Sequence, residues 1–94
     1  MKLILNSNVS IALRPENSQR RGGDVLKMQV PDLNEKGRKQ TTANLKKIFS
    51  QHPNFAGSDR DKEDKITTYY YANTKLVNFV LWLVSKGIGV EQIT

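Results

Sequence analysis

His52 is the side chain best suited to acid–base chemistry, because it is the single histidine and imidazole titrates near neutral pH. It follows an apolar stripe and precedes Pro53, where a histidine can also cap the carbonyls at a helix end. No other residue at motif spacing forms a nucleophile–base pair with it. We therefore expect a structural role for His52, no catalytic residues, and a protein that is not an enzyme.

Metal and nucleotide sites find little support in the sequence. The chain contains no cysteine, which removes disulfides and thiolate zinc sites. Asp59, Asp61 and Glu63 alternate as in a calcium loop, but the glycine and the closing glutamate of such a loop are missing. Gly22-Gly23 lacks the Gly-Lys-Ser/Thr ending of a phosphate loop. We expect no metal, no cofactor and no small-molecule substrate.

Basic side chains are the best binding candidates. Fifteen Lys and Arg against nine Asp and Glu give a net charge of +6, which favours polyanion partners. Lys39 and Lys46 lie two helical turns apart on one face, where cations can contact phosphates. Arg20-Arg21 at a hairpin tip can grip phosphates or enter a groove. A solvated surface explains both groups as well. The predicted nucleic-acid-binding residues are Arg20, Arg21, Lys36, Arg38, Lys39, Lys46, Lys47 and Lys75.

The elements that would position these residues begin with strands. Residues 2–5 and 9–13 have strand patterns separated by a polar break, and 9–13 alternates apolar and small residues. Residues 14–24 have a loop composition. Residues 25–30 predict a further strand, which Pro31 ends. The two sides of the loop could form an antiparallel hairpin, which needs a helix to pack against.

A first helix is predicted at about 35–51, starting near Asn34 or Thr41. Leu45, Ile48 and Phe49 lie on its apolar face. Residues 54–58 then have the composition of a linker. The alternating charges of 59–65 indicate a solvated loop or a first helical turn.

The second helix is predicted at about 66–86, ending at Gly87. Its stripe of Leu76, Val80 and Leu83 should be buried together with Ile48 and Phe49. Threonines and tyrosines at 67–71 are weak helix formers, so 66–71 is alternatively a strand, with the helix starting at Asn73. Residues 90–93 follow as one turn or a short strand.

The C-terminal segment resembles the first long helix of the core-binding domain of tyrosine recombinases, the phage-integrase family. The resemblance covers about residues 66–94, and an aromatic usual in the family is replaced by Ala72. It implies a module that clamps duplex DNA, because the family's catalytic residues lie in a following domain. The matching residues are Thr68, Leu76, Phe79, Trp82-Leu83, Gly87-Ile88 and Ile93-Thr94.

These observations predict an α+β fold in one domain, 1–94, with a β-rich part at 1–31 and a helical part at 34–94. The predicted function is a cytoplasmic, non-catalytic module that binds nucleic acid, with duplex DNA as the expected partner and a homodimer or protein partner as a further option. No membrane segment is expected, because the apolar run 77–84 is too short to span a bilayer. The alternative is a small phage- or plasmid-type interaction module that engages a host protein through Phe79 and Trp82.

Overall fold

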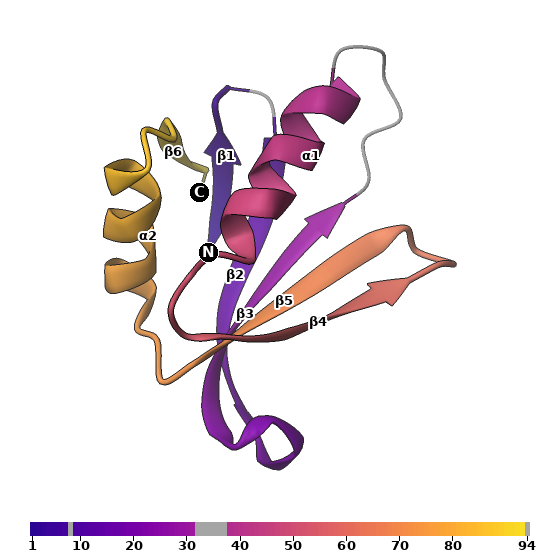
Figure 1. Cartoon of the computed structure of the whole chain (residues 1–94), viewed down its shortest axis with the longest axis vertical. Helices are drawn as coiled ribbons and strands as arrows, with labels where there is room; N and C mark the ends of the chain where they lie inside the picture. The colour runs from indigo at the N-terminus through magenta and orange to yellow at the C-terminus, as the bar shows by residue number, and fades with distance from the viewer. Residues whose placement is uncertain (8, 32–37, 94) are drawn as a thin grey trace.

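The computed structural model describes residues 1–7, 9–31 and 38–93, and the side chains of 38–43 are outside that description. Six strands form one antiparallel sheet, and two helices lie on the same face of it (Figure 1). The elements are β1 (Lys2–Leu5), β2 (Val9–Ser18), the short 3-10 helix η1 (Gln19–Arg21), β3 (Gly23–Pro31), α1 (Arg38–Phe49), β4 (Phe55–Asp61), β5 (Ile66–Ala72), α2 (Leu76–Ser85) and β6 (Val90–Ile93).

The sheet confirms the predicted α+β class, but its strands come from the whole length of the chain. Its order is β4-β5-β3-β2-β1-β6, so the C-terminal β6 pairs with the N-terminal β1. The division into a β-rich 1–31 and a helical 34–94 is therefore wrong. Three of the six strands follow residue 54, and they share one sheet with the first three.

The hairpin of β2 and β3 is longer than predicted, because β2 continues through Pro15 to Ser18. The expected loop at 14–24 shrinks to η1 and its flanking turn. Leu13 exchanges backbone hydrogen bonds with Met1, at the very start of the chain. At position 15, two residues on, a backbone N–H would point to the same side, where no described strand pairs with β2. Pro15, which has no N–H, therefore costs the sheet no hydrogen bond.

The prediction of one helix over 66–86 is wrong, and the alternative of a strand at 66–71 is confirmed. Burial alternates along β5: Thr67, Tyr69 and Tyr71 are buried, and the residues between them are half-buried. Thr and Tyr favour this pleated setting, and β5 pairs with β3 on one side and β4 on the other. The helix starts at Leu76 instead of Asn73, which adopts a left-handed conformation in the preceding turn.

β4 (Phe55–Asp61) takes up the predicted linker at 54–58 from Phe55 onward and the first three residues of the predicted loop at 59–65. It is an edge strand, and its last residues Asp59, Arg60 and Asp61 are exposed and charged. Charged residues on an edge oppose pairing with other chains. The alternating charges therefore mark a protected sheet edge and the turn that follows it.

The predicted end of the second helix at Gly87 is confirmed in detail. Gly87 has a φ of 78°, and its N–H donates to Val84 O, while Ile88 N–H donates to Leu83 O. These two bonds form the Schellman arrangement, which satisfies carbonyls left free at a helix end. Ile88 and Leu83 are both buried, which fixes the turn against the core. Residues 90–93 are the short strand β6, one of the two predicted options.

The core lies between the sheet and the two helices. Phe49 of α1 and Leu83 of α2 are fully buried, as predicted, whereas Ile48, Leu76 and Val80 are half-buried at its margin. The sheet supplies most of the remainder, and Phe79 completes it from α2. The largest fully buried side chains are Tyr71, Phe49, Phe79, Leu3, Leu5, Ile11, Leu13, Leu26, Met28, Leu83, Val9 and Val30.

Candidate nucleic-acid interface

α1 carries half of the predicted basic residues on a helix fixed by its apolar side. Leu45 and Phe49, four residues apart, are buried against the sheet. Lys47 is exposed on the outer side, and Lys46 is half-buried with its ammonium 3.5 Å from Thr67 Oγ1. The helix contains no acidic residue. Its described outer side is therefore positively charged.

Two further predicted cations, Arg38 and Lys39, lie in the first turn of α1, although their side chains are outside the described part. Lys36 lies outside the described residues altogether. The backbone places the first-turn pair seven to nine residues before Lys46 and Lys47. At 1.5 Å per residue the two pairs are separated by about 12 Å along the axis.

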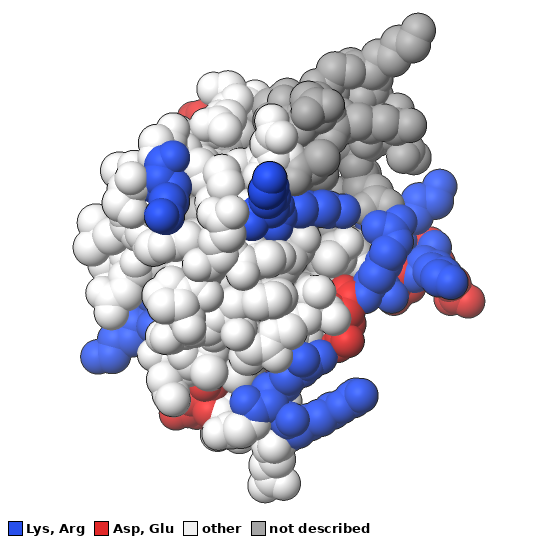
Figure 2. All heavy atoms as spheres, in the orientation of Figure 1, with Lys and Arg blue, Asp and Glu red and all other residues white. Residues whose placement is uncertain are grey.

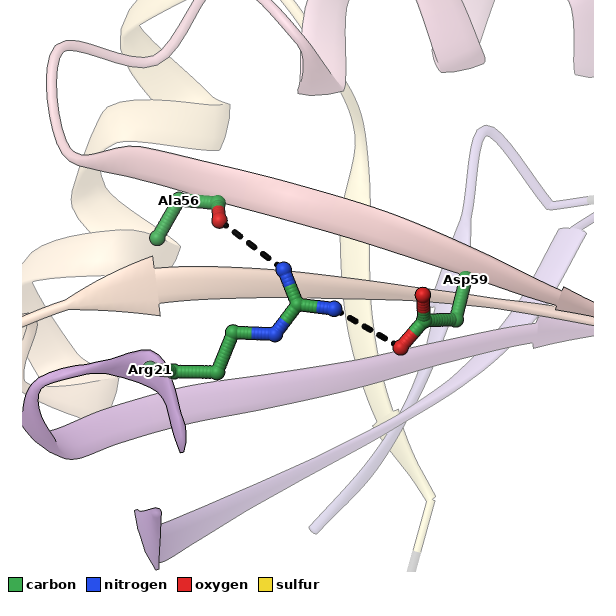
Figure 3. Close-up of polar contacts among 3 residues, drawn as sticks. All are labelled: Arg21, Ala56 and Asp59. Atoms are coloured by element: carbon green, nitrogen blue, oxygen red, sulfur yellow. Dashed lines mark hydrogen bonds and ion pairs between the residues drawn. The ribbon is translucent and has the colours of Figure 1, made fainter. Parts of the chain in front are cut away.

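The two adjacent arginines at the hairpin tip have different environments. Arg20 is exposed on η1. Arg21 reaches to β4, where Nη1 donates to Ala56 O at 3.1 Å and Nη2 contacts Asp59 at 2.8 Å (Figure 3). Its guanidinium also lies 4.3 Å from the centre of the Tyr70 ring. Because these contacts occupy its fork and one of its faces, we remove Arg21 from the predicted phosphate-binding set.

Lys75 has a different electrostatic environment from the cations of α1. It is the exposed residue that precedes α2, and it lines a pocket of about 620 Å³ beside the β2–β3 hairpin. Glu16 and Asp24 line the same pocket. The carboxylates that line this pocket with Lys75 lower the positive potential around it, which weakens its attraction for phosphate.

The sequence reading missed a second basic position on the helix-free face of the sheet. Arg14 on β2 lies directly opposite Lys27 on β3. Lys27 Nζ is 4.0 Å from Glu16, so part of this charge is balanced. The strand alternation of Val9, Ile11 and Leu13 could have revealed this placement, since the next residue, Arg14, must face the other way.

His52 is held among aromatic rings, which is a different structural setting from the predicted capping of helix-end carbonyls. Its ring centre lies 4.6 Å from that of Trp82 and 5.1 Å from that of Tyr71. Its Nδ1 accepts a hydrogen bond of 3.0 Å from the Asn54 N–H. Burial lowers the pKa of His52 from 6.5, so the ring favours its neutral form.

The predicted protein-binding surface of Phe79 and Trp82 does not exist as an exposed patch. Phe79 is fully buried and packs on Tyr71, with ring centres 4.6 Å apart. Trp82 is half-buried and stacks on Phe79 at 5.7 Å. The reason is the orientation of α2, which turns its aromatic side toward the sheet and His52. The exposed apolar side chains of α2 are Val77, Leu81 and Val84 instead.

The described part of the chain offers neither a metal-binding cluster nor a membrane-spanning helix. It contains no group of three or more His, Asp or Glu side chains that could hold a metal ion. No helix of the described residues is long and apolar enough to cross a membrane. Neither finding alters the assignment of α1 as the candidate interface.

Comparison with protein-family models, curated proteins and solved structures finds no match for this chain. The residues behind the recombinase resemblance are divided among several elements, with Thr68 in β5, Leu76 to Leu83 in α2 and Ile93 in β6. A single long helix, on which that resemblance depends, is absent from the described C-terminal region. α1 therefore remains the candidate interface.

Proposed function

We propose that this protein is a cytoplasmic, non-catalytic module that binds duplex DNA through phosphate contacts made by α1. The observation that supports this most strongly is the charge of the helix: four cations and no carboxylate in twelve residues. An exposed helix normally mixes both signs of charge. A helix that carries cations alone attracts a polyanion and repels a basic partner.

The spacing of the cations along α1 suits a DNA groove. The two pairs, Arg38-Lys39 and Lys46-Lys47, are about 12 Å apart along the axis, which is about the width of the major groove. A helix lying in or across that groove brings its two ends to the phosphates of the two strands. Contacts of this kind give affinity and orientation without reading bases.

The basic residues of the β4–β5 turn provide an internal comparison. Lys62 and Lys65 are exposed, like Lys47, but Asp61 precedes them and Glu63 and Asp64 lie between them. Their mixed charges cancel over short distances, so this turn should contribute little to phosphate binding. The two regions allow a test in which the same number of charges is removed from each.

The test is a titration of a fluorescently labelled random-sequence duplex, followed by anisotropy. The parent should bind at low salt, and Lys46→Gln/Lys47→Gln should bind several-fold more weakly. Lys62→Gln/Lys65→Gln is the matched control and should bind like the parent. Equal weakening in both variants would show that net charge, and not α1, governs binding. An absence of binding by the parent would end the proposal.

A second candidate function, a protein-interaction module, is favoured by one observation. The outer side of α2 exposes Val77, Leu81 and Val84, and exposed apolar groups of this extent often mark protein contacts. The host-protein reading thus moves from Phe79 and Trp82 to the opposite side of the same helix.

A further inference from the structure

The solvent side of α2 is uncharged along its whole length, and an apolar stripe runs along it beside the polar Asn78 and Ser85. Val77, Leu81 and Val84 are 63%, 62% and 55% exposed, and no charged residue occurs between Lys75 and Lys86. A surface helix usually carries charged side chains on its outer face. Figure 2 shows the corresponding broad white area over α2, with basic side chains only towards its margins.

A groove joins this helix to the nearest edge of the sheet. It has a volume of about 350 Å³, and its lining is apolar except for Gln92. In the described chain, the remaining large hydrophobic side chains that are strongly exposed are Met1 and Ile93, and both lie at this same edge. The lining residues are Met1, Leu3, Leu76, Val77, Val80, Val84, Val90 and Gln92.

The outer edge of β6 presents backbone groups that no described strand pairs with. Met1 bonds to Leu13 across the β1–β2 pair, so the odd residues of β1 point to β2 and its even residues point to β6. Lys2 and Ile4 face Ile93 and Glu91 in the β1–β6 register. The N–H and C=O groups of the other two residues of β6, Val90 and Gln92, therefore point outward.

The two edges of the sheet differ in how they are protected. β4 has an irregular register at Gly57 and a run of charges from Asp59 to Asp61. Both features oppose pairing with another chain. β6 pairs with β1 in regular register and carries one charged residue, Glu91. Its open backbone and the apolar face of α2 lie on adjoining surfaces.

We propose that this face, made of α2 and the β6 edge, binds a second copy of the same chain around a two-fold axis. An antiparallel strand edge can pair with itself, and so can an uncharged apolar helix face, which makes both parts self-complementary. A register centred on Gln92 sets Glu91 opposite Ile93 of the second copy, so two glutamates do not meet. The result is one sheet continuous across the dimer.

A dimer of ordinary size needs only a small part of the surface of each copy. A stable interface removes roughly 800 Å² per partner, about an eighth of the 6076 Å² surface of this chain. α1 belongs to a different part of the surface from β6, so the dimer carries two copies of the proposed DNA-binding helix.

The test is sedimentation velocity of the parent over a range of concentrations. We expect a reversible monomer–dimer equilibrium that is strengthened by salt, because each copy carries a charge of +6. Leu81→Glu should raise the dimer dissociation constant at least about a hundredfold, since the change occurs twice per dimer. Asn78→Glu is the matched control: it adds the same charge to an exposed position outside the apolar stripe and should dimerise like the parent.

A second variant tests the strand edge. Gln92→Pro removes an outward N–H without removing a bond to β1, so it should also weaken the dimer while thermal unfolding of the monomer stays nearly unchanged. A parent that stays monomeric at every concentration, or a dimer that survives Leu81→Glu, would overturn the proposal. Salt strengthens this dimer and weakens DNA binding, so either proposal can fail without the other.

Discussion

Replacing Arg21 with Ala should destabilise the protein strongly, although the residue lies in a surface turn. The change removes a charge-assisted hydrogen bond to Ala56 O, worth about 1.5–3 kcal/mol. It also removes the contact with Asp59, which at that carboxylate's exposure adds about 0.2–1 kcal/mol. The stacking on Tyr70 contributes about 0.5–1 kcal/mol. Because these contacts share one guanidinium and do not simply add, we expect a loss of about 2–3 kcal/mol.

The loss is large for a chain of this size, whose whole stability should be about 5–15 kcal/mol. Differential scanning calorimetry should show Tm lowered by at least about 8 °C. Arg20→Ala removes the same side chain from the exposed neighbour and should leave Tm nearly unchanged. Gly57→Ala should act like Arg21→Ala, because a Cβ there meets the guanidinium and φ is 120°. Equal Tm values for Arg20→Ala and Arg21→Ala would refute the reasoning.

Three further predictions concern the core and its margin. Leu83→Ala should cost about 2–5 kcal/mol in urea unfolding, whereas Leu81→Ala should change little; similar losses would show that α2 is oriented differently. Tyr71→Phe leaves the Phe49 carbonyl without its buried 2.9 Å partner and should cost about 1–3 kcal/mol, so an unchanged midpoint would argue against that bond. Burial lowers the pKa of His52 from 6.5, so the free energy of unfolding should decrease as the pH falls below 6.5. His52→Gln should reduce the difference in unfolding free energy between about pH 7.5 and about pH 5. An unaltered pH dependence would contradict the ring packing.

Sequence patterns located the local elements where one periodicity dominated. The alternation at Val9, Ile11 and Leu13 predicted a strand, and Gly87 marked the helix end that the Schellman bonds confirm. Residues 66–72 were ambiguous, because their apolar spacing suits a helix while their Thr and Tyr content suits a strand. The sheet decided the outcome, since β5 gains partners on both sides.

The long-range contacts could not be predicted from local patterns. Nothing near β6 in the sequence indicates that it pairs with β1 at the opposite end of the chain. Likewise, Arg20 and Arg21 look equivalent as a basic pair, yet only the fold brings Asp59 and Ala56 to Arg21. Part of the candidate site therefore remains a prediction, since Lys46 and Lys47 lie on the helix as expected. Arg21 has a structural role instead.

The salt dependence of duplex binding tests the central claim, that α1 contacts DNA phosphates, most directly. For the parent, the logarithm of the binding constant should fall linearly with the logarithm of salt concentration, by about 0.9 per phosphate contacted. Lys46→Gln/Lys47→Gln should flatten this slope by roughly one to two units, and Lys62→Gln/Lys65→Gln should leave it unchanged. Identical slopes for the parent and the α1 variant would contradict the account.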